Sequence, residues 1–312
     1  MIDSIRANHF MDWELIAVDD GSDVATLELM QHYASIDQRI RFLQREKEPK
    51  GAQTCRNIGL DEACGEFIVF FDSDDYITPT CLETRVHALQ QRTDVDFMVF
   101  PSGVYEEGML QTTNATRRFG RPVYKDDLQA FARRTLPFIV WNNIYRTASL
   151  RQHHIRWDVK LKSLQDADYN VQTLLSGLKY TYADAQPDYA YRLNITQSIS
   201  TKLVTDEHFR NHIYAQEKFF ILYRQQFGHQ YDSALYQGVL FLYDVVCREE
   251  HNKRFATMLT EMLRRQSRGM AFRFGMTMKM IQILALVLPH NRARQISLFG
   301  YLLKKRFQCS NQ

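Results

Sequence analysis

The sequence predicts an α/β domain, in which a sheet is flanked by helices, followed by an α-helical region. In roughly the first 100 residues, short apolar runs alternate with stretches of helical spacing, a pattern typical of strand–helix–strand units with right-handed crossovers. After about residue 204 the helical spacing continues and strand-like runs stop. These two observations predict a first domain over residues 1–203 and a helical region over residues 204–312.

The strands of the first domain are expected where apolar runs of strand length occur. The run Phe-Ile-Val-Phe-Phe at 67–71 is nearly continuous, which is typical of a strand buried on both faces. The expected strands lie at 14–18, 40–43, 67–71 and 96–100.

The helices between these strands are expected from spacing and end signals. Ser22 or Asp23 is a suitable N-cap for the first helix, and Pro79 suits the first turn of the third. The expected helices lie at 23–35, 52–63 and 79–92.

The rest of the chain is expected to be mainly helical. Residues 101–120 predict loops or an irregular hairpin, and the Tyr-rich stretch 180–192 is strand-like. The remaining expected helices lie at 124–134, 166–176, 205–227, 231–249, 253–267, 276–288 and 292–307.

Composition and charge narrow the class of protein. The hydrophobic share of 45% and charged share of 24% exclude a disordered chain. Residues 1–105 carry 9 Lys/Arg against 19 Asp/Glu, which argues against nucleic-acid binding by this part because phosphate contacts need cations. The five cysteines form no CxxC pair, which favours a reducing compartment. The N-terminus lacks the pattern of a signal peptide, so we expect a cytoplasmic protein.

Two groups of carboxylates follow expected strands, where open α/β sheets bind their ligands. Asp19 and Asp20 follow the first strand, and Asp72, Asp74 and Asp75 follow the third. Carboxylates so close together repel one another unless a cation joins them, and Mg²⁺ is usually held by one or two carboxylates plus substrate phosphates. The second group therefore predicts a site for Mg²⁺ or Mn²⁺ and a diphosphate. The alternative is a capped turn before the next helix.

Several blocks of the sequence resemble the family 2 glycosyltransferases in order and spacing. They are WELIAVDDGS (13–22), RIRFLQ (39–44) and KGAQTCRNIGLDEACGEFIVFFDSDDYITP (50–79). The resemblance is strong over residues 2–102 and continues more weakly to residue 200. It implies the GT-A fold, a Rossmann-like mixed sheet flanked by helices, and transfer from a nucleotide-diphospho-sugar donor.

The resemblance also implies roles for individual residues. Asp20 falls where the family contacts the nucleotide base, and Asp72 where it binds the ribose and diphosphate. Asp74 and Asp75 fall on the metal-binding positions. Arg56 and Arg192 are expected to face the donor phosphates. On the acceptor side the matching residues are Trp141 and Asn142, although Trp141 suits the core equally well.

The family's catalytic base lies in an acidic motif at the start of a helix, which Gln165-Asp166-Ala167-Asp168 matches. Asp166 stands in the position of the base. An inverting transfer needs such a carboxylate to accept the proton of the acceptor hydroxyl. Gln165 replaces a Glu that is common in the family, and Asp168 is the alternative base.

One departure bears on activity: the chain starts at a segment that resembles the helix after the family's first strand. By the resemblance, that central strand is absent. Three explanations stay open, namely a start codon further upstream, another segment in its place, or a decayed enzyme. The sequence thus predicts a glycosyltransferase of surface-polysaccharide synthesis that uses a nucleotide-sugar, most simply a UDP-sugar, and a glycan or lipid-linked acceptor. The alternative is a truncated homologue that acts as a binding or scaffold protein.

The last part of the chain is strongly basic, with 12 Lys/Arg against one acidic residue in 251–312. Its most apolar stretch, 280–288, is too short to span a bilayer, which needs about 20 apolar residues. Two interpretations stay open. The helices pack on one another, or they place the protein peripherally on the inner face of the cell membrane through contact with anionic lipids.

Overall fold

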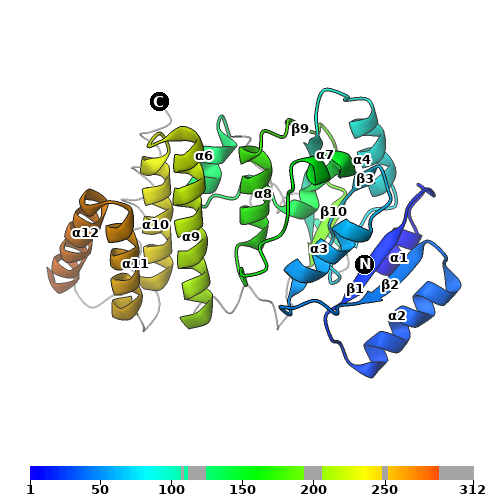
Figure 1. The fold of residues 1–312 in the computed structure, drawn as a ribbon, viewed down its shortest axis with the longest axis horizontal. Coiled ribbons are helices and arrows are strands. Elements are labelled where there is room, and N and C mark those ends of the chain that lie inside the picture. The colour runs from blue at the N-terminus through cyan, green and yellow to red at the C-terminus, as the bar shows by residue number, and fades with distance from the viewer. Residues whose placement is uncertain (107–108, 112–123, 193–205, 248–251, 288–312) are drawn as a thin grey trace. The chain divides into compact units, whose positions relative to one another are not determined.

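The computed structural model describes residues 1–106, 109–111, 124–192, 206–247 and 252–287. The chain divides into two compact units. Unit 1 comprises residues 1–131 and 136–198, and unit 2 comprises residues 132–135 and 199–312. Figure 1 shows strands and helices mixed in unit 1, whereas the described part of unit 2 is mainly helical.

The described residues of unit 1 form three groups of strands, in which parallel and antiparallel pairs occur together, so the predicted mixed α/β class is confirmed. The first group is the parallel pair β1 (Leu15–Asp19) and β2 (Ile40–Gln44). The second has the order β3 (Phe67–Ile68), β8 (Asn143–Arg146), β5 (Phe97–Val99) and β9 (Tyr180–Tyr182). The third has the order β4 (Tyr76–Ile77), β10 (Tyr189–Arg192), β6 (Ser102–Glu106) and β7 (Met109–Gln111).

Helices connect and flank these strands (Figure 1). Those of unit 1 are α1 (Ile2–Arg6), α2 (Val24–Ile36), α3 (Ala52–Glu62), α4 (Cys81–Gln90), α6 (Asp127–Ala132), which ends in unit 2, the 3₁₀ turn η1 (Val140–Asn142), α7 (Thr147–Gln152) and α8 (Gln165–Leu175). Of the two expected caps for α2, the structure uses Asp23, whose carboxylate accepts a 2.9 Å hydrogen bond from the Thr26 amide. The helix expected from the resemblance at the start of the chain is α1, whereas the sequence pattern missed α7, β4 and β8, which are too short to show a period.

The apolar run at 67–71 departs from expectation. Only Phe67 and Ile68 form a strand, and the whole run is half-buried instead of buried on both faces. Among the described residues β3 pairs with β8 alone and β1 with β2 alone, so neither strand has neighbours on both sides. Phe70 instead packs edge-on against Trp157 and Tyr169, with ring centroids 5.6 Å apart in both pairs. Beyond the end of the strand, Phe70 thus contributes to the packing beside α8.

A buried ion pair joins α4 to the start of β10. Arg85 is fully buried and donates hydrogen bonds of 2.8 and 2.7 Å to the two oxygens of Asp188. Its remaining nitrogen donates to the Trp141 carbonyl at 2.7 Å. Because removing either charge would leave the other buried and unpaired, this contact fixes β10 and η1 against α4.

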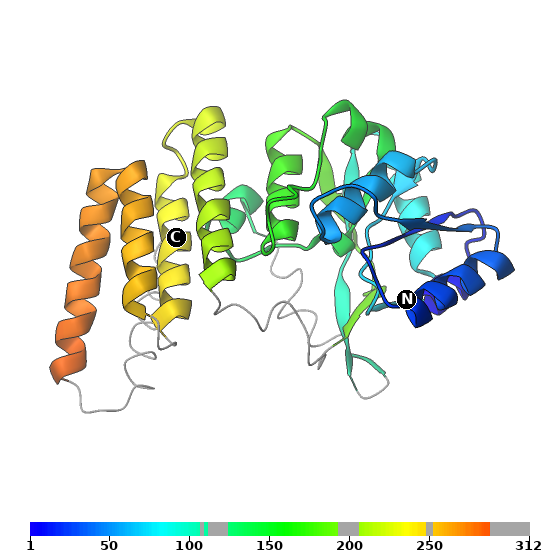
Figure 2. The same ribbon diagram turned by 60° about the horizontal axis from the view of Figure 1, so that its bottom comes forward.

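The described part of unit 2 consists mainly of four helices, which follow one another in chain order and pack side by side (Figure 2). They are α9 (Asp206–Phe227), α10 (Asp232–Cys247), α11 (Asn252–Gln266) and α12 (Arg268–Val287). The start of α12 was expected at 276, but the helix begins at Arg268. Ala271 and Phe274 are buried there, and Phe274 packs edge-on against Tyr243, so packing outweighs the weak helix propensity of the nearby glycines.

The described part of the chain ends at residue 287. The expected helix at 292–307 lies outside the described residues. Within the described part of the chain, every helix is too short or too polar to cross a membrane.

Candidate active site

An ion pair between α3 and the loop after β3 forms the centre of the candidate site. Arg56 of α3 donates from Nη2 to Asp72 Oδ1 at 2.6 Å and from Nη1 to Gln165 Oε1 at 2.9 Å. The Arg56 side chain is only 19% exposed, so its charge acts in a partly desolvated environment. One guanidinium therefore joins residues 72–75, here called the acidic loop, to Gln165, the first residue of α8.

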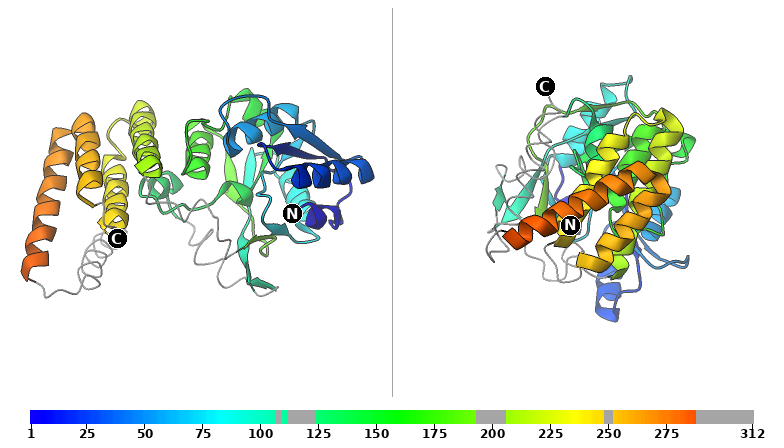
Figure 3. Two further views of the ribbon diagram at one scale, coloured as in Figure 1. Left: turned by 90° about the horizontal axis from the view of Figure 1, so that it is seen from below. Right: turned by 90° about the vertical axis from the view of Figure 1, so that its left-hand side faces the viewer.

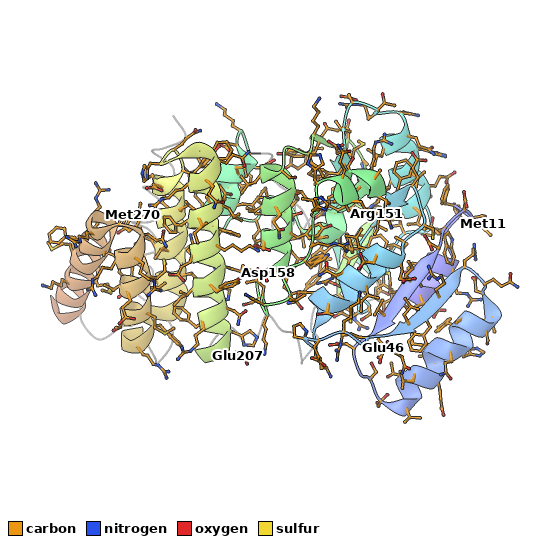
Figure 4. The ribbon with its side chains drawn as sticks, in the orientation of Figure 1. Met11, Glu46, Arg151, Asp158, Glu207 and Met270 are labelled. Carbon is orange, nitrogen blue, oxygen red and sulfur yellow. The ribbon has the colours of Figure 1, made fainter. Side chains whose placement is uncertain are left out.

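Trp157, which belongs to no sequence motif, packs against the guanidinium of Arg56. The guanidinium lies over the indole ring, 4.5 Å from its centroid, and the indole stacks on Tyr169 at 4.4 Å. The Asn57 side chain exchanges two 2.9 Å hydrogen bonds with the backbone of Trp157. The loop that carries Trp157 runs between α7 and α8, where Figure 4 labels its neighbour Asp158.

The C-terminal end of α3 is held by a side chain of α7. Arg151, labelled in Figure 4, donates from Nη2 to the carbonyls of Leu60 and Ala63 at 3.1 and 2.6 Å. A cation suits this place because the last carbonyls of a helix are unpaired and carry partial negative charge. The middle and the C-terminal end of α3 are thus fixed, which holds Arg56 in position.

Asp166 lies in the first turn of α8, beside Arg56 and Asp72. Desolvation raises the pKa of Asp166 to about 6, against the opposing effect of the Arg56 guanidinium, and the Asp72 carboxylate adds to the rise. The side chain is half-buried and keeps part of its surface accessible. A carboxylate with this pKa is largely deprotonated at neutral pH yet is a stronger base than an ordinary Asp.

Asp168, the alternative base, occupies different surroundings. Its side chain is 1% exposed, and Oδ2 accepts a 2.7 Å hydrogen bond from Gln172 one turn further along α8. Two residues apart on a helix, Asp166 and Asp168 point to different sides. Asp166 alone of the two lies beside the Arg56–Asp72 pair.

Asp75 is held by β10 at the other side of the acidic loop. Asp75 is 1% exposed, and its carboxylate accepts hydrogen bonds from the Tyr189 hydroxyl and, at 2.7 Å, from the Arg192 amide. Desolvation raises the pKa of Asp75 to about 6. The guanidinium of Arg192 lies near the Tyr76 ring, 5.9 Å from its centroid.

Tyr189 is buried next to the acidic loop, and its hydroxyl contacts Asp75. Burial raises the pKa of its hydroxyl well above the usual range, and the nearby Asp72 and Asp75 carboxylates raise it further. The hydroxyl therefore stays protonated and donates to Asp75. Sequence reasoning missed this residue, although it lies in the Tyr-rich block at 189–192.

The fit of a divalent cation can be judged from the same loop. Asp74 is exposed, while both Asp75 oxygens already accept hydrogen bonds. No group of three or more metal-ligating side chains occurs among the residues that the structure describes. One or two carboxylates plus substrate phosphates are enough for Mg²⁺, so Asp74 and Asp72 fit such an ion. The predicted metal contact of Asp75 stays a prediction.

Asp20 is placed by a third set of contacts. Its Oδ1 accepts from Arg45 Nε at 2.6 Å and from the Gly51 amide at 3.1 Å. Gly51 has a φ of +148°, which residues with a Cβ rarely adopt, so the turn at the start of α3 favours glycine. Asp20 therefore lies near the N-terminus of the helix that carries Arg56.

The two residues predicted for the acceptor side lie in the core. Trp141 is buried and stacks on Tyr189 and Tyr191, with centroids 5.4 and 5.5 Å apart. Asn142 is fully buried, and its Nδ2 donates to the Phe100 carbonyl at 2.7 Å. Both side chains join η1 to neighbouring strands, and their contact with an acceptor stays a prediction.

Comparison with known proteins places this arrangement in a family. Residues 1–153 match the family described as glycosyl transferase family 2. The glycosyltransferase EpsH of Bacillus subtilis is 24% identical over 200 residues, which cover 64% of this chain and 57% of EpsH. The poly(ribitol-phosphate) β-N-acetylglucosaminyltransferase TarS of Staphylococcus aureus is 24% identical over 201 residues, which cover 64% of this chain and 33% of TarS. The chain thus spans little more than half of one relative and a third of the other.

The fold comparison agrees with the sequence comparison. The crystal structure of residues 1–349 of S. aureus TarS in complex with UDP-GlcNAc superposes with a TM-score of 0.66 at 19% identity, over 86% of this chain and 78% of that one. This likeness shows a shared GT-A fold. Through residues 1–153, the chain belongs to glycosyl transferase family 2.

Proposed function

We propose that the chain is an inverting, metal-dependent glycosyltransferase that uses a nucleotide-sugar donor. The observation that carries this proposal is the contact of Arg56 with Asp72 beside Asp166. It sets a carboxylate with a raised pKa next to a cation and an acidic loop. General-base catalysis and binding of a charged leaving group need these two parts together.

In the proposed reaction Asp166 accepts the proton of the acceptor hydroxyl. The acceptor oxygen then attacks the anomeric carbon of the sugar, and the bond from that carbon to the diphosphate oxygen breaks. The nucleoside diphosphate leaves with the electron pair, and the configuration at the anomeric carbon inverts. The half-buried position of Asp166 lets it meet an acceptor while keeping its pKa near 6.

The donor would be held by residues from the strand ends. Asp20 is proposed for the nucleotide base, Asp72 for the ribose and diphosphate, and Arg56 and Arg192 for the phosphates. A Mg²⁺ or Mn²⁺ ion on Asp74 and Asp72 would supply positive charge that stabilises the leaving diphosphate.

The similar proteins support the proposed identities of the donor and the acceptor. A TarS structure contains UDP-GlcNAc, and the name TarS describes transfer of N-acetylglucosamine to poly(ribitol-phosphate). We therefore propose a UDP-sugar donor and a glycan or lipid-linked acceptor in surface-polysaccharide synthesis. Such a reaction would take place at the cytoplasmic face of the membrane.

The test begins with donor binding. Thermal unfolding is followed with UDP alone, with Mn²⁺ alone and with both, and we expect the largest rise in Tm with both. Asp74→Asn should remove the Mn²⁺-dependent part, while Asp12→Asn, which changes an exposed carboxylate elsewhere, should keep it. NMR of a product anomeric proton then decides inversion. If UDP and Mn²⁺ together leave the Tm unchanged, the proposal is contradicted.

A second candidate, a non-catalytic scaffold, is favoured by one observation. Among the described residues, β1 pairs with β2 alone, and all five of its residues are only half-buried. A sheet with this open edge is less rigid than a continuous one, because edge strands leave backbone groups unpaired. Binding of UDP without any transfer to a range of acceptors would favour the scaffold.

A further inference from the structure

The outer face of α12 presents an apolar stripe to solvent. Phe272, Met276 and Met280 follow one another at intervals of four residues, so they lie on one face of the helix. They are 71%, 53% and 51% exposed, although their side chains are large and apolar. Figure 3 shows α12 beside α11 in unit 2, and the opposite face of α12 is the one that carries the buried Ala271 and Phe274. An apolar stripe left open in this way marks a surface that meets a partner.

Basic side chains surround this stripe. Arg268 and Lys279 lie four and three residues from Phe272 and Met276, and Arg273 lies three residues before Met276. All three are exposed, and none forms an ion pair with a described residue. Between 254 and 280 the sequence holds six Arg or Lys and a single acidic residue, Glu261. The face is therefore positive around an apolar centre.

A groove runs between α11 and α12 next to the stripe. Its volume is about 440 Å³, and its lining includes Arg264, Arg268, Lys279, Phe272 and Met276. Cations at the mouth of an apolar groove match a phospholipid, in which a negative headgroup sits above acyl chains. A protein with an acidic rim and an apolar centre is the other possible occupant, and the vesicle experiment below distinguishes it from a membrane.

We infer that the face formed by α12 and its groove with α11 docks on the surface of a membrane that contains anionic phospholipids. Phe272, Met276 and Met280 enter the boundary between headgroups and acyl chains, and Arg264, Arg268, Arg273 and Lys279 contact the headgroups. This inference goes beyond the proposed transfer reaction. Its test uses no sugar donor, so the two can fail independently.

The test measures sedimentation of the full-length protein with vesicles. Vesicles of phosphatidylcholine alone are compared with vesicles that also contain phosphatidylglycerol, each at low and at high salt. We expect binding only to the vesicles with phosphatidylglycerol, and loss of that binding at high salt, because salt screens exposed charges. Each basic residue at the surface contributes about fivefold to the partition coefficient, so Arg268→Gln with Lys279→Gln should lower it roughly thirtyfold.

Matched variants separate this face from general charge. Arg210→Gln with Lys160→Gln removes the same charge at exposed sites elsewhere and should leave binding nearly unchanged. Phe272→Ser with Met276→Ser should also weaken binding, whereas Ile221→Ser, a 52% exposed residue of α9, should not. Circular dichroism checks that each variant is folded. Absence of binding to phosphatidylglycerol vesicles at low salt, or equal loss in the two charge variants, overturns the inference.

Discussion

Arg56 donates a 2.6 Å hydrogen bond to Asp72, and the same guanidinium reaches Gln165 at the start of α8. The guanidinium thus joins α3 and the loop after β3 to the start of α8, which lies 109 positions further along the chain. It also explains why Gln165 can stand where relatives are expected to carry Glu. A neutral amide oxygen accepts a hydrogen bond from Arg56 without adding a further negative charge beside Asp72 and Asp166.

Replacing the proposed base should separate catalysis from donor binding. Asp166→Asn cannot accept the acceptor's proton, so kcat should fall by about 100-fold or more. The Kd for UDP with Mn²⁺ should stay within about twofold, because Asp166 faces the acceptor in the proposed reaction. Calorimetry and a transfer assay measure the two quantities. Transfer at the parental rate in Asp166→Asn would exclude this residue and direct attention to Asp168.

The pH dependence of transfer should show the raised pKa of the base. Only deprotonated Asp166 can accept a proton, so kcat/KM should increase as the pH rises through about 6 and then level off. Arg56 lowers this pKa, so Arg56→Gln should move the increase to higher pH. Asp12→Asn serves as the control and should leave the profile in place. A profile that Arg56→Gln does not shift would show that another group sets it.

Replacing Asp74, the exposed carboxylate of the acidic loop, should weaken metal binding without lowering the stability of the fold. Asp74→Asn should weaken binding of Mn²⁺ with UDP by about tenfold or more, because a charged oxygen ligand is lost. Its Tm without ligands should match that of the parent, since Asp74 is exposed. Differential scanning fluorimetry with and without UDP and Mn²⁺ measures both effects. An unchanged Mn²⁺ dependence would remove Asp74 from the proposed metal site.

The buried ion pair behind the site should matter for stability. Arg85→Met leaves Asp188 buried and unpaired, so the free energy of unfolding should fall by about 3–5 kcal/mol. Arg85→Met combined with Asp188→Leu removes both charges and should recover part of that loss. Urea denaturation followed by circular dichroism measures each variant. The exposed pair of Arg92 and Asp94 offers a control, and Arg92→Met should change stability by less than about 1 kcal/mol.

Local features of the fold were readable from the sequence. The runs at 14–18 and 40–43 became β1 and β2, and Asp23 caps α2 as one of the two expected residues. The carboxylates at 72–75 follow β3 as predicted. These features depend on residues within one or two turns of each other, so period, caps and composition are enough to reveal them.

The site itself was decided by contacts between distant segments. Arg56 and Gln165 are 109 positions apart, Asn57 and Trp157 are 100 apart, and Asp75 and Arg192 are 117 apart. No local pattern indicates that Trp157 supports Arg56, that Tyr189 binds Asp75, or that Asn142 is fully buried. Likewise, the run at 67–71 has the composition of a buried strand, but only Phe67 and Ile68 pair with β8, and Phe70 packs against Trp157 and Tyr169, which are about 90 to 100 positions away.

The sequence by itself thus determined the α/β class, the acidic loop and the resemblance to family 2 glycosyltransferases, because local periodicity and motif order fix them. The tertiary structure decided which carboxylates differ in pKa and why. Asp166 and Asp75 have raised pKa values because folding desolvates them, whereas Asp74, one residue from Asp75, stays exposed. Burial depends on how the whole chain packs, so it cannot be read from the type of a residue.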